Sequence, residues 1–290
     1  MDMTKCRAFV QCVDSGGFTV AAEKLGYTQS GITRMVQALE EELGCALLVR
    51  NRQGTRPTAE GKRLLPLLRE LCRVNEKVTQ LSAEIRGLSV GEVTVGTYFS
   101  IAACWLPSII KDFEMSYPNI RINIVEATNM ELAERLKKRT LDCCFMSWSK
   151  DLKCDWLPLR NDRMVAWLPA DHPLAEGESF PIGQADGAPF IIYVPDRDTD
   201  LDRLIAEGKF RPNIRYTTLD SCTAYAMVEA GLGISINDEL STGRMKGRVV
   251  SLPLEPPEYI SLGIAALSMH ELSPAAKKFI DCARQVIKNL

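Results

Sequence analysis

Residues 17–44 read GFTVAAEKLGYTQSGITRMVQALEEELG, and this stretch decides the fold of the amino-terminal end of the 290-residue chain. Thr19 can cap a short helix that runs to Leu25, and Gly26 suits the left-handed residue that ends it. Thr28 can cap a second helix, whose apolar residues share one face: Ile32, Val36, Leu39 and Leu43. Two short helices joined by a tight turn that contains glycine predict a helix-turn-helix.

The opposite face of the second helix carries hydrogen-bonding side chains near its start: Thr28, Gln29, Ser30, Thr33, Arg34 and Gln37. On an isolated helix, a solvated face would be the simpler interpretation. In a helix-turn-helix, however, the first residues of the second helix face base edges in the major groove. Gln can read adenine, Arg can read guanine, and Ser or Thr can reach a phosphate or a base. We therefore predict that these six residues contact DNA.

A small β-hairpin is expected after the helix-turn-helix. Residues 46–50 read as a strand, residues 51–54 as a turn and residues 55–57 as the returning strand. The hairpin carries three arginines: Arg50, Arg52 and Arg56. On a wing beside a duplex, such arginines supply salt-dependent phosphate affinity rather than sequence choice. The alternative is that they are ordinary solvated arginines.

Charge is distributed unevenly along the chain. The formal net charge is −2, yet residues 1–87 are +3, with 13 Lys and Arg against 10 Asp and Glu, and residues 88–290 are −5, with 22 against 27. Between positions 50 and 69, Glu60 is the single acid among six basic residues: Arg50, Arg52, Arg56, Lys62, Arg63 and Arg69. This asymmetry predicts a basic patch on the amino-terminal domain, as DNA binding requires.

Four ordered segments between residues 9 and 61 carry a family resemblance: GFTVAAEKL at 17–25, TQSGITR at 28–34, LEEELG at 39–44 and PTAEG at 57–61. They resemble the DNA-binding domain of the LysR-type transcriptional regulators. The chain departs from the family at Thr28, Thr33 and Leu48, where Ser, Ser and Phe are more usual. The first two keep a hydroxyl, and Leu48 affects only packing. The resemblance implies sequence-specific binding to double-stranded promoter DNA, with RNA polymerase as a further partner.

A long helix is expected after the hairpin, because Thr58 can cap it, Glu60 is favourable in its first turn, and the pattern continues to Arg86. Apolar residues recur along it at heptad positions a and d: Leu64, Leu67, Leu71, Val74, Val78, Leu81 and Ile85. This spacing predicts a coiled-coil seam between two copies of the chain, with burial against the chain's own second domain as the alternative. The LysR resemblance likewise implies a linker helix that pairs between subunits, in a homodimer or homotetramer.

Strands and helices alternate from Gly91 onward, which predicts a mostly parallel sheet in two α/β lobes. Strands are expected near residues 93–95, 120–125, 143–146, 164–168, 190–193, 214–217, 233–236 and 259–266, and helices near 101–115, 130–139, 199–207, 221–230 and 274–288. The last strand and helix could belong to either lobe.

The resemblance implies a periplasmic-binding-protein-like effector domain for this α/β part. The expected fold thus has three parts: an all-α winged helix-turn-helix at residues 1–58, a dimerising linker helix at 59–89, and an α/β effector-binding domain at 90–290. Lobe I is expected at about 90–161 and 267–290, and lobe II at about 162–266.

A small-molecule effector is expected at the carboxyl ends of the strands, where open α/β sheets collect ligands. Residues with hydroxyl groups stand at those ends: Ser100, Thr128, Ser147, Tyr193 and Ser221. The resemblance implies an inter-lobe cleft lined by Ser100, Ile101, Thr128, Met146, Ser147 and Tyr193. Each hydroxyl could instead be a helix cap. Because none of these positions is Arg or Lys, a carboxylate would rely on helix dipoles and hydroxyls, and a neutral or aromatic effector is equally admissible.

The residues give no positive support for an enzyme. The sequence contains no GxGxxG, P-loop, HExxH or GxSxG motif, so we expect no catalytic residue and no cofactor. Ten cysteines without a CxxC, and only His172 and His270 beside them, favour reduced thiols over a metal site or a disulfide framework. A thiol-based, redox-responsive regulator of the same architecture is the alternative function.

The cellular location is predicted from what the sequence lacks. No run approaches the roughly 18 apolar residues of a membrane span. The first residues also lack the apolar core of a signal peptide. We therefore expect a cytoplasmic protein without a membrane partner.

Overall fold

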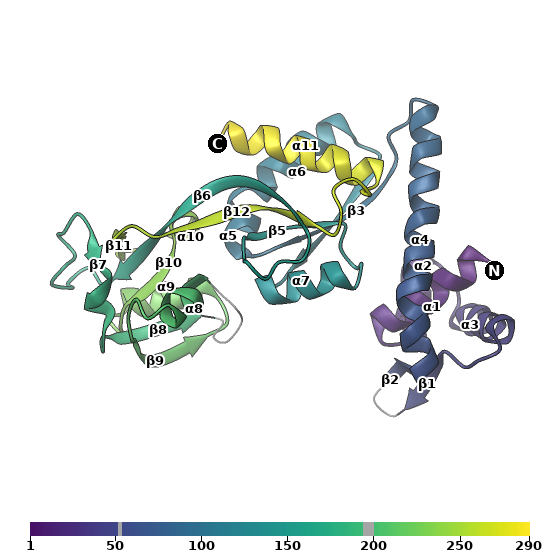
Figure 1. Ribbon diagram of the computed structural model, residues 1–290, viewed down its shortest axis with the longest axis horizontal. Coiled ribbons are helices and arrows are strands. Elements are labelled where there is room, and N and C mark those ends of the chain that lie inside the picture. The colour runs from purple at the N-terminus through teal and green to yellow at the C-terminus, as the bar shows by residue number, and fades with distance from the viewer. Residues whose placement is uncertain (52–53, 194–199) are drawn as a thin grey trace. The chain divides into compact units, whose positions relative to one another are not determined.

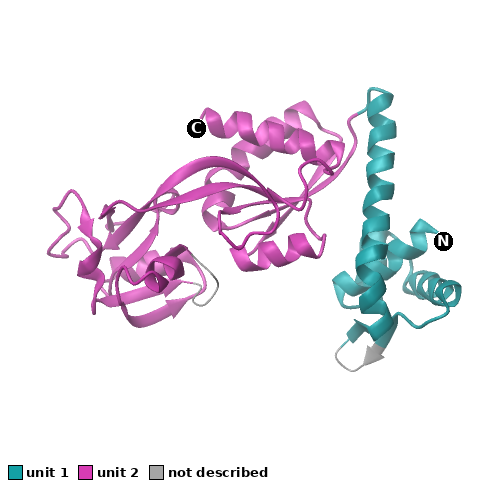
Figure 2. Ribbon diagram, viewed as in Figure 1, with its two compact units in different colours: residues 1–88 teal, residues 89–290 magenta. Residues whose placement is uncertain are grey.

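The computed structural model describes residues 1–51, 54–193 and 200–290. The chain divides into two compact units, Met1–Leu88 and Ser89–Leu290, which we call unit 1 and unit 2 (Figures 1 and 2). Each unit has its own buried apolar core. None of the described helices is both long enough and apolar enough to cross a membrane.

Unit 1 is a small helical domain with a hairpin and one long helix. Its elements are α1 (Met3–Ser15), α2 (Phe18–Leu25), α3 (Gln29–Leu43), β1 (Leu48–Asn51), β2 (Gly54–Pro57) and α4 (Ala59–Ile85). The buried side chains of Phe9, Ile32, Leu39 and Leu47 bring α1, α3 and the start of the hairpin together. The winged helix-turn-helix predicted from residues 17–57 is therefore confirmed in its order and its core.

Local capping explains where the helices of unit 1 begin and end. The Thr28 hydroxyl accepts the backbone N–H of Gly31 (3.1 Å), and Gly26 ends α2 at a left-handed φ of 70°. Both features match the prediction. The cap of α2 was predicted wrongly, because Gly17 holds the capping position and Thr19 lies within the helix. Phe18, which is only 8% exposed, packs into the core and fixes this earlier start.

Unit 2 is an α/β domain. Its strands are β3 (Gly91–Thr97), β4 (Ile120–Glu126), β5 (Cys143–Ser147), β6 (Asp155–Leu168), β7 (Phe180–Pro181), β8 (Pro189–Tyr193), β9 (Asn213–Thr218), β10 (Ser235–Asp238), β11 (Val250–Glu255) and β12 (Tyr259–Ala266). Its helices are α5 (Phe99–Cys104), α6 (Leu106–Ser116), α7 (Asn129–Lys137), the 3₁₀ helix η1 (Ile182–Ala185), α8 (Asp200–Ala206), α9 (Ser221–Glu229), α10 (Glu239–Thr242) and α11 (Pro274–Lys288).

The main sheet of unit 2 is mixed, which corrects the expectation of a mostly parallel one. Its described strands follow the order β4-β3-β5-β12-β6-β11-β7, with β10 also paired to β6 and with β8 and β9 forming a separate pair. The pairs of β3 with β4 and β5 are parallel, whereas β12 runs antiparallel to both β5 and β6. Figure 1 shows β6 and β12 running between the part with α6, α7 and α11 and the part with β8 and β9.

The two faces of strand β5 belong to different apolar clusters. Cys143 is fully buried in the main core with Phe145, and Cys144 is fully buried in a second cluster with Leu132. The two adjacent thiols therefore pack on opposite faces of the strand. The last helix, α11, lies against α6 and β3, so the chain returns to the first half of unit 2 after β12.

Candidate functional site

The start of α3 presents the polar surface predicted to read DNA. Gln29, Ser30, Arg34 and Gln37 are exposed, and no other part of unit 1 covers them. Thr28 is also exposed while its hydroxyl caps the helix. The six predicted residues therefore occupy the N-cap and the first two and a half turns of α3. Thr33 is half-buried, and its hydroxyl donates to the Gln29 carbonyl (2.9 Å).

The wing is held against the helix-turn-helix by hydrogen bonds that its backbone N–H groups donate. One carboxylate oxygen of Glu40 in α3 accepts the N–H groups of Leu47 (2.6 Å) and Leu48 (3.0 Å). On the other strand, the N–H of Thr55 donates to the carbonyl of Gly16, at the end of α1 (3.0 Å). These bonds leave the hairpin little freedom to move away from α3.

The predicted arginines of the wing are placed unequally by the structure. Arg56 is exposed on β2, opposite Val49 of β1. Arg50 lies in strand β1, and Arg52 lies outside the described residues. Lys62 and Arg63, at the start of α4, are exposed as the predicted basic patch requires.

Arg69 does not belong to the basic patch, which corrects the sequence interpretation. Its side chain is 9% exposed and forms an ion pair with Asp14 of α1. A guanidinium buried in this way holds α4 against α1 and is not available to a phosphate. Arg69 and its neighbour Leu68 are both buried, so this side of α4, away from the heptad seam, packs on the core of unit 1.

An uncovered apolar stripe runs along α4. Six of the seven residues predicted for the dimer seam are exposed, with fractions that reach 61% at Val78 and 80% at Ile85: Leu67, Leu71, Val74, Val78, Leu81 and Ile85. The seventh, Leu64, is half-buried against the core of unit 1. The stripe is thus free of contacts from unit 1 along five turns of the helix, as a subunit contact needs.

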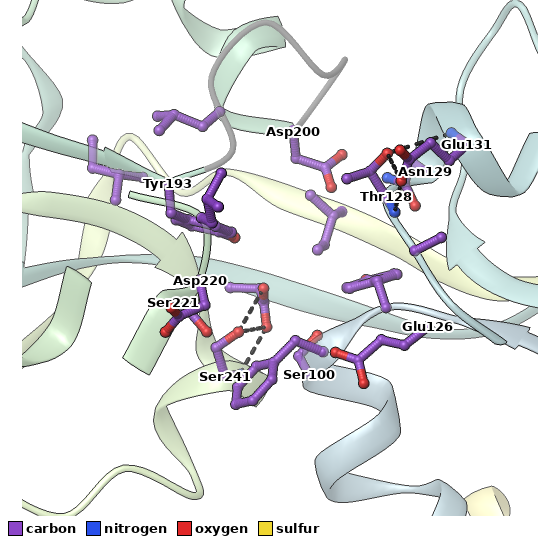
Figure 3. Close-up of a pocket in the computed structure, with 18 of the residues that line it drawn as sticks. Ser100, Glu126, Thr128, Asn129, Glu131, Tyr193, Asp200, Asp220, Ser221 and Ser241 are labelled. Carbon is purple, nitrogen blue, oxygen red and sulfur yellow. Dashed lines mark hydrogen bonds between the residues drawn. The ribbon is translucent and has the colours of Figure 1, made fainter. Parts of the chain in front are cut away.

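Unit 2 contains a cavity of about 360 Å³ between its two halves. Side chains from β4, α5 and α7 on one side face those from β8 and α9 on the other; the labelled Thr128 and Asn129 lie across the space from Tyr193 and Asp220 (Figure 3). Four of the seven predicted effector residues line this cavity: Ser100, Thr128, Tyr193 and Ser221.

The other three predicted effector residues lie behind the cavity wall. Ile101 is fully buried in the main core, and Met146 is 2% exposed in the second cluster. Ser147 also lies behind the wall, where its hydroxyl oxygen accepts a hydrogen bond from Asn129 Nδ2 (2.6 Å). It therefore orients a side chain that does line the cavity.

Carboxylates were missed by the sequence interpretation, although five of them line the cavity: Glu126, Glu131, Asp200, Asp220 and Asp238. Three of these acids cap or brace helices. Glu131 completes a capping box with Thr128, Asp220 accepts the N–H of Thr223 (2.7 Å), and Asp238 accepts the N–H of Ser241 (2.7 Å). An acidic residue at a helix start was the sequence signal that could have identified these cavity residues, but ordinary helix caps carry the same signal.

Several polar atoms at the cavity have no partner among the described residues. The hydroxyl oxygens of Ser100 and Ser221 are buried and unpaired, as are Tyr98 Oη and Asn129 Oδ1. Ser100 is 1% exposed and Ser221 is 2% exposed. Buried polar groups are normally satisfied, so such a cluster around one cavity indicates that a bound molecule or water completes it.

The buried carboxyl groups near the cavity hold their protons more tightly than usual. Burial raises the pKa of Asp238, although hydrogen bonds from Ser241 and its own backbone oppose the effect. Burial also raises the pKa of Asp162, which lies beneath α10, to about 6. No group of three His, Cys, Asp or Glu residues in the described part of the chain is placed to hold a metal ion.

The thiols are shifted toward their unreactive form. Burial is the main cause that raises the pKa of eight cysteines: Cys6, Cys72, Cys104, Cys143, Cys144, Cys154, Cys222 and Cys282. Cys72 reaches about 11. Because the thiolate is the reactive form, these environments do not favour redox sensing.

Two family models match the chain. The model described as bacterial regulatory helix-turn-helix protein, lysR family, matches residues 3–62, and the LysR substrate binding domain matches residues 86–288. The second match alone spans more than half of the 290 residues.

Individual relatives match over nearly the full length. The chain is 29% identical to the uncharacterized HTH-type transcriptional regulator YvbU of Bacillus subtilis, with 99% of each chain covered. The structure is similar to full-length OxyR from Pseudomonas aeruginosa, with a TM-score of 0.76, 21% identity and coverage of 99% and 95%. It is also similar to full-length CbnR in complex with its target DNA, with a TM-score of 0.66, 19% identity and coverage of 99% and 100%. The expected fold class is confirmed.

Proposed function

Because this chain belongs to the LysR family of DNA-binding transcriptional regulators, we propose that it binds promoter DNA as a homodimer or homotetramer and responds to a small molecule. In this proposal the first turns of α3 read bases, and the wing contacts phosphates. The seam of α4 joins two copies, and the cavity of unit 2 takes the effector. RNA polymerase is the further partner expected of such a regulator.

The observation that carries the DNA-binding part is the uncovered start of α3 beside the wing. Gln29, Arg34 and Gln37 are exposed on successive turns, and their types match base-reading side chains. The similar CbnR was solved with its target DNA, which supports the same use of this domain. Two copies of α3 would reach two half-sites, so the exposed seam of α4 supports pairing.

The cavity supports control by a small molecule. It lies between the two halves of unit 2, where β6 and β12 are the long strands common to both. A molecule that contacts Thr128 on one side and Tyr193 on the other would bind the closed arrangement better than an open one. It would then shift the population toward closure, and the helix α4 would pass that change to the DNA-binding domain.

The test is a quantitative binding assay with the DNA upstream of the regulated gene. Gln29→Ala and Arg34→Ala each remove one base contact, which is worth about 1–3 kcal/mol, so specific affinity should fall by roughly tenfold or more. Affinity for unrelated DNA should change far less. As a matched control, Lys24→Ala lies at the end of α2 and should leave the specific affinity close to that of the wild type. Unchanged specific affinity in both α3 variants would contradict the proposal.

A further inference from the structure

The charge of the cavity identifies the class of molecule that it takes. Its described lining contains the five carboxylates Glu126, Glu131, Asp200, Asp220 and Asp238, and no Lys, Arg or His. The chain has 35 Lys and Arg residues, so the lack of basic residues in this lining does not reflect a lack of them in the sequence. The surroundings therefore repel an anionic ligand and attract a cation.

Carboxylates of the chain also stand at two of the helix starts that line the cavity. The usual anion site is a helix start with free N–H groups. At α7 the capping box pairs the N–H groups of Thr128 and Glu131, and at α9 the Asp220 carboxylate accepts both the N–H and the hydroxyl of Thr223 (2.7 and 2.9 Å). A ligand carboxylate or phosphate at either of these two helix starts would therefore meet a carboxylate of the chain, which repels it.

One of the unpaired polar atoms, Asn129 Oδ1, requires a hydrogen-bond donor from the ligand, because an amide oxygen only accepts. Asn129 Nδ2 donates to Ser147, so Asn129 Oδ1 is left as a buried acceptor with no donor. The hydroxyl oxygens of Ser100 and Ser221, both almost fully buried, can accept as well. An ammonium group has three donors and no acceptor, which matches this set of oxygens. Two sides of the cavity contribute to it, because Asn129 and Ser221 come from α7 and α9.

The rest of the lining is apolar and the space is small. Phe99, Met164, Leu219, Ile236 and Ile260 also line the cavity. Its volume of about 360 Å³ is near the lower end of ligand pockets, which begin at about 300 Å³. A bare metal ion does not fit, because no three of the described His, Cys, Asp and Glu residues converge as metal ligands. The ligand must combine a cationic head with a short apolar body.

We propose that the effector of this regulator is a small protonated amine with an apolar body, bound with its ammonium group among these carboxylates and hydroxyls. This proposal rests on the proposed function of the cavity as the effector site. Glu126, at the end of β4, is the acid expected to pair with the ammonium group. Its backbone pairs with Thr97 of β3, but its carboxylate, unlike those of Asp220 and Asp238, forms no hydrogen bond or ion pair with a described residue. Figure 3 shows it on the side of the cavity opposite Tyr193.

The experiment is isothermal titration calorimetry of the full chain with three phenyl probes of similar shape and one smaller amine. Butylamine and 2-phenylethylamine represent the proposed class, and 3-phenylpropanoate and 2-phenylethanol represent anionic and neutral molecules. At least one amine should bind ten times or more tightly than both of the others. The inference is overturned if the carboxylate or the alcohol binds as well as the amines, or if neither amine binds at millimolar concentration.

Two variants of Glu126 assign the binding to this cavity. Glu126→Gln keeps the size of the side chain but removes its charge, and should weaken the amine at least tenfold; Glu126→Lys should abolish amine binding and favour 3-phenylpropanoate. Glu114→Gln, an exposed acid of α6 outside the cavity, is the control and should bind amines like the wild type. Unchanged amine affinity in Glu126→Gln overturns the inference.

The failure of this inference is distinguishable from failure of the proposed function. DNA binding by Gln29→Ala and Arg34→Ala is measured without any amine, so it tests the DNA-binding part alone. If 3-phenylpropanoate alone binds and changes promoter affinity, the effector function stands and the cationic class is wrong. If amines bind but leave promoter affinity unchanged, the cationic class stands and control of DNA binding by the cavity is wrong.

Discussion

A Cβ added at Gly61 of α4 would lie 2.1 Å from the backbone carbonyl oxygen of Leu47. This close approach joins the first turn of the linker helix to the chain that enters the wing, and the N–H of Thr58 donates to the same carbonyl (2.9 Å). The position of the wing beside α3 thus depends on the absence of a side chain at residue 61. The PTAEG segment contains this glycine because no other residue fits without moving the backbone.

We expect Gly61→Ala to destabilise unit 1 by about 1–3 kcal/mol, as overpacking usually does. This cost exceeds the gain of about 1 kcal/mol that alanine brings to a helix interior. Promoter affinity should fall as the wing moves. Thermal unfolding and a DNA-binding assay measure the two effects. Gly183→Ala, in η1 of unit 2, is the control, since nothing lies within 4 Å of its added Cβ, and it should stay close to the wild type in both assays.

Features set by neighbouring residues could be predicted from the sequence. The hydroxyl groups of Thr28 and Thr58 each accept a hydrogen bond from the N–H of the residue three positions later in the chain. Both caps are therefore determined by a few consecutive residues. The stripe of α4 was predictable for the same reason, because a heptad spacing on one helix decides which side chains share a face. The break at Trp105 between α5 and α6 was missed, although Pro107 in the first turn of α6 was its local signal.

Features set by distant pairing could not be predicted in this way. β12 lies antiparallel to β6, where Ala265 pairs with Trp156 across more than 100 residues, and no local pattern specifies that direction. β11 was missed because Pro253 argues against a strand, yet it pairs with Val165 of β6. The acids of the cavity were missed for a related reason: Asp220 and Asp238 read as ordinary caps until the fold brings α9 and α10 to one space.

Arg56 of the wing should contribute to affinity without contributing to sequence choice. We expect Arg56→Ala to weaken specific and unrelated DNA alike, because a phosphate contact carries no base information. The slope of log affinity against log salt should decrease by about 1. Fluorescence anisotropy at several salt concentrations measures it. Arg34→Ala is the comparison, since a base-reading residue should lower the preference for the specific site; equal loss of preference in both variants would contradict these roles.

The seam of α4 should hold two copies together. Val78→Asp places a charge on a stripe residue that is 61% exposed in one chain, so the dimer should dissociate if the stripe is the contact. The double variant Leu71→Asp with Val78→Asp should be fully monomeric. Sedimentation velocity measures the size of the assembly. Thr79→Asp adds the same charge at the next, exposed residue outside the seam and should leave the dimer intact. A stable dimer in Leu71→Asp with Val78→Asp would rule out this contact.

The charged form of Asp162 should lower the free energy of unfolding of unit 2 at neutral pH, compared with the protonated form. Burial, together with the nearby carboxylates of Asp238 and Glu239, raises the pKa of Asp162 from 3.8 to about 6, against the hydrogen bond from the Leu240 N–H and the charge of Arg160. The folded state therefore binds the proton more tightly, and the contribution of this group to stability falls as the pH rises from about 4 to about 6.

Asp162→Asn removes this charge and can still accept the N–H of Leu240. We expect the variant to match the wild type near pH 4 and to be more stable at pH 7.5, by on the order of 2 kcal/mol. Thermal unfolding of both proteins across this pH range measures the difference. Asp112→Asn, an exposed acid of α6, should show no difference that grows with pH. A difference of the opposite sign would mean that the charged form of Asp162 stabilises the fold.

Peroxide should leave promoter binding unchanged, because burial raises the pKa of Cys104 and of Cys222 and keeps both thiols protonated at neutral pH. Cys104 Sγ also donates to the Leu240 carbonyl (3.3 Å), which further favours the thiol. The measurement compares promoter affinity of the wild type, Cys104→Ser and Cys222→Ser before and after peroxide, with dithiothreitol added to reverse any oxidation. A reversible change in the wild type that either serine variant abolishes would establish a redox response, and the thiol would then join the cavity as a means of control.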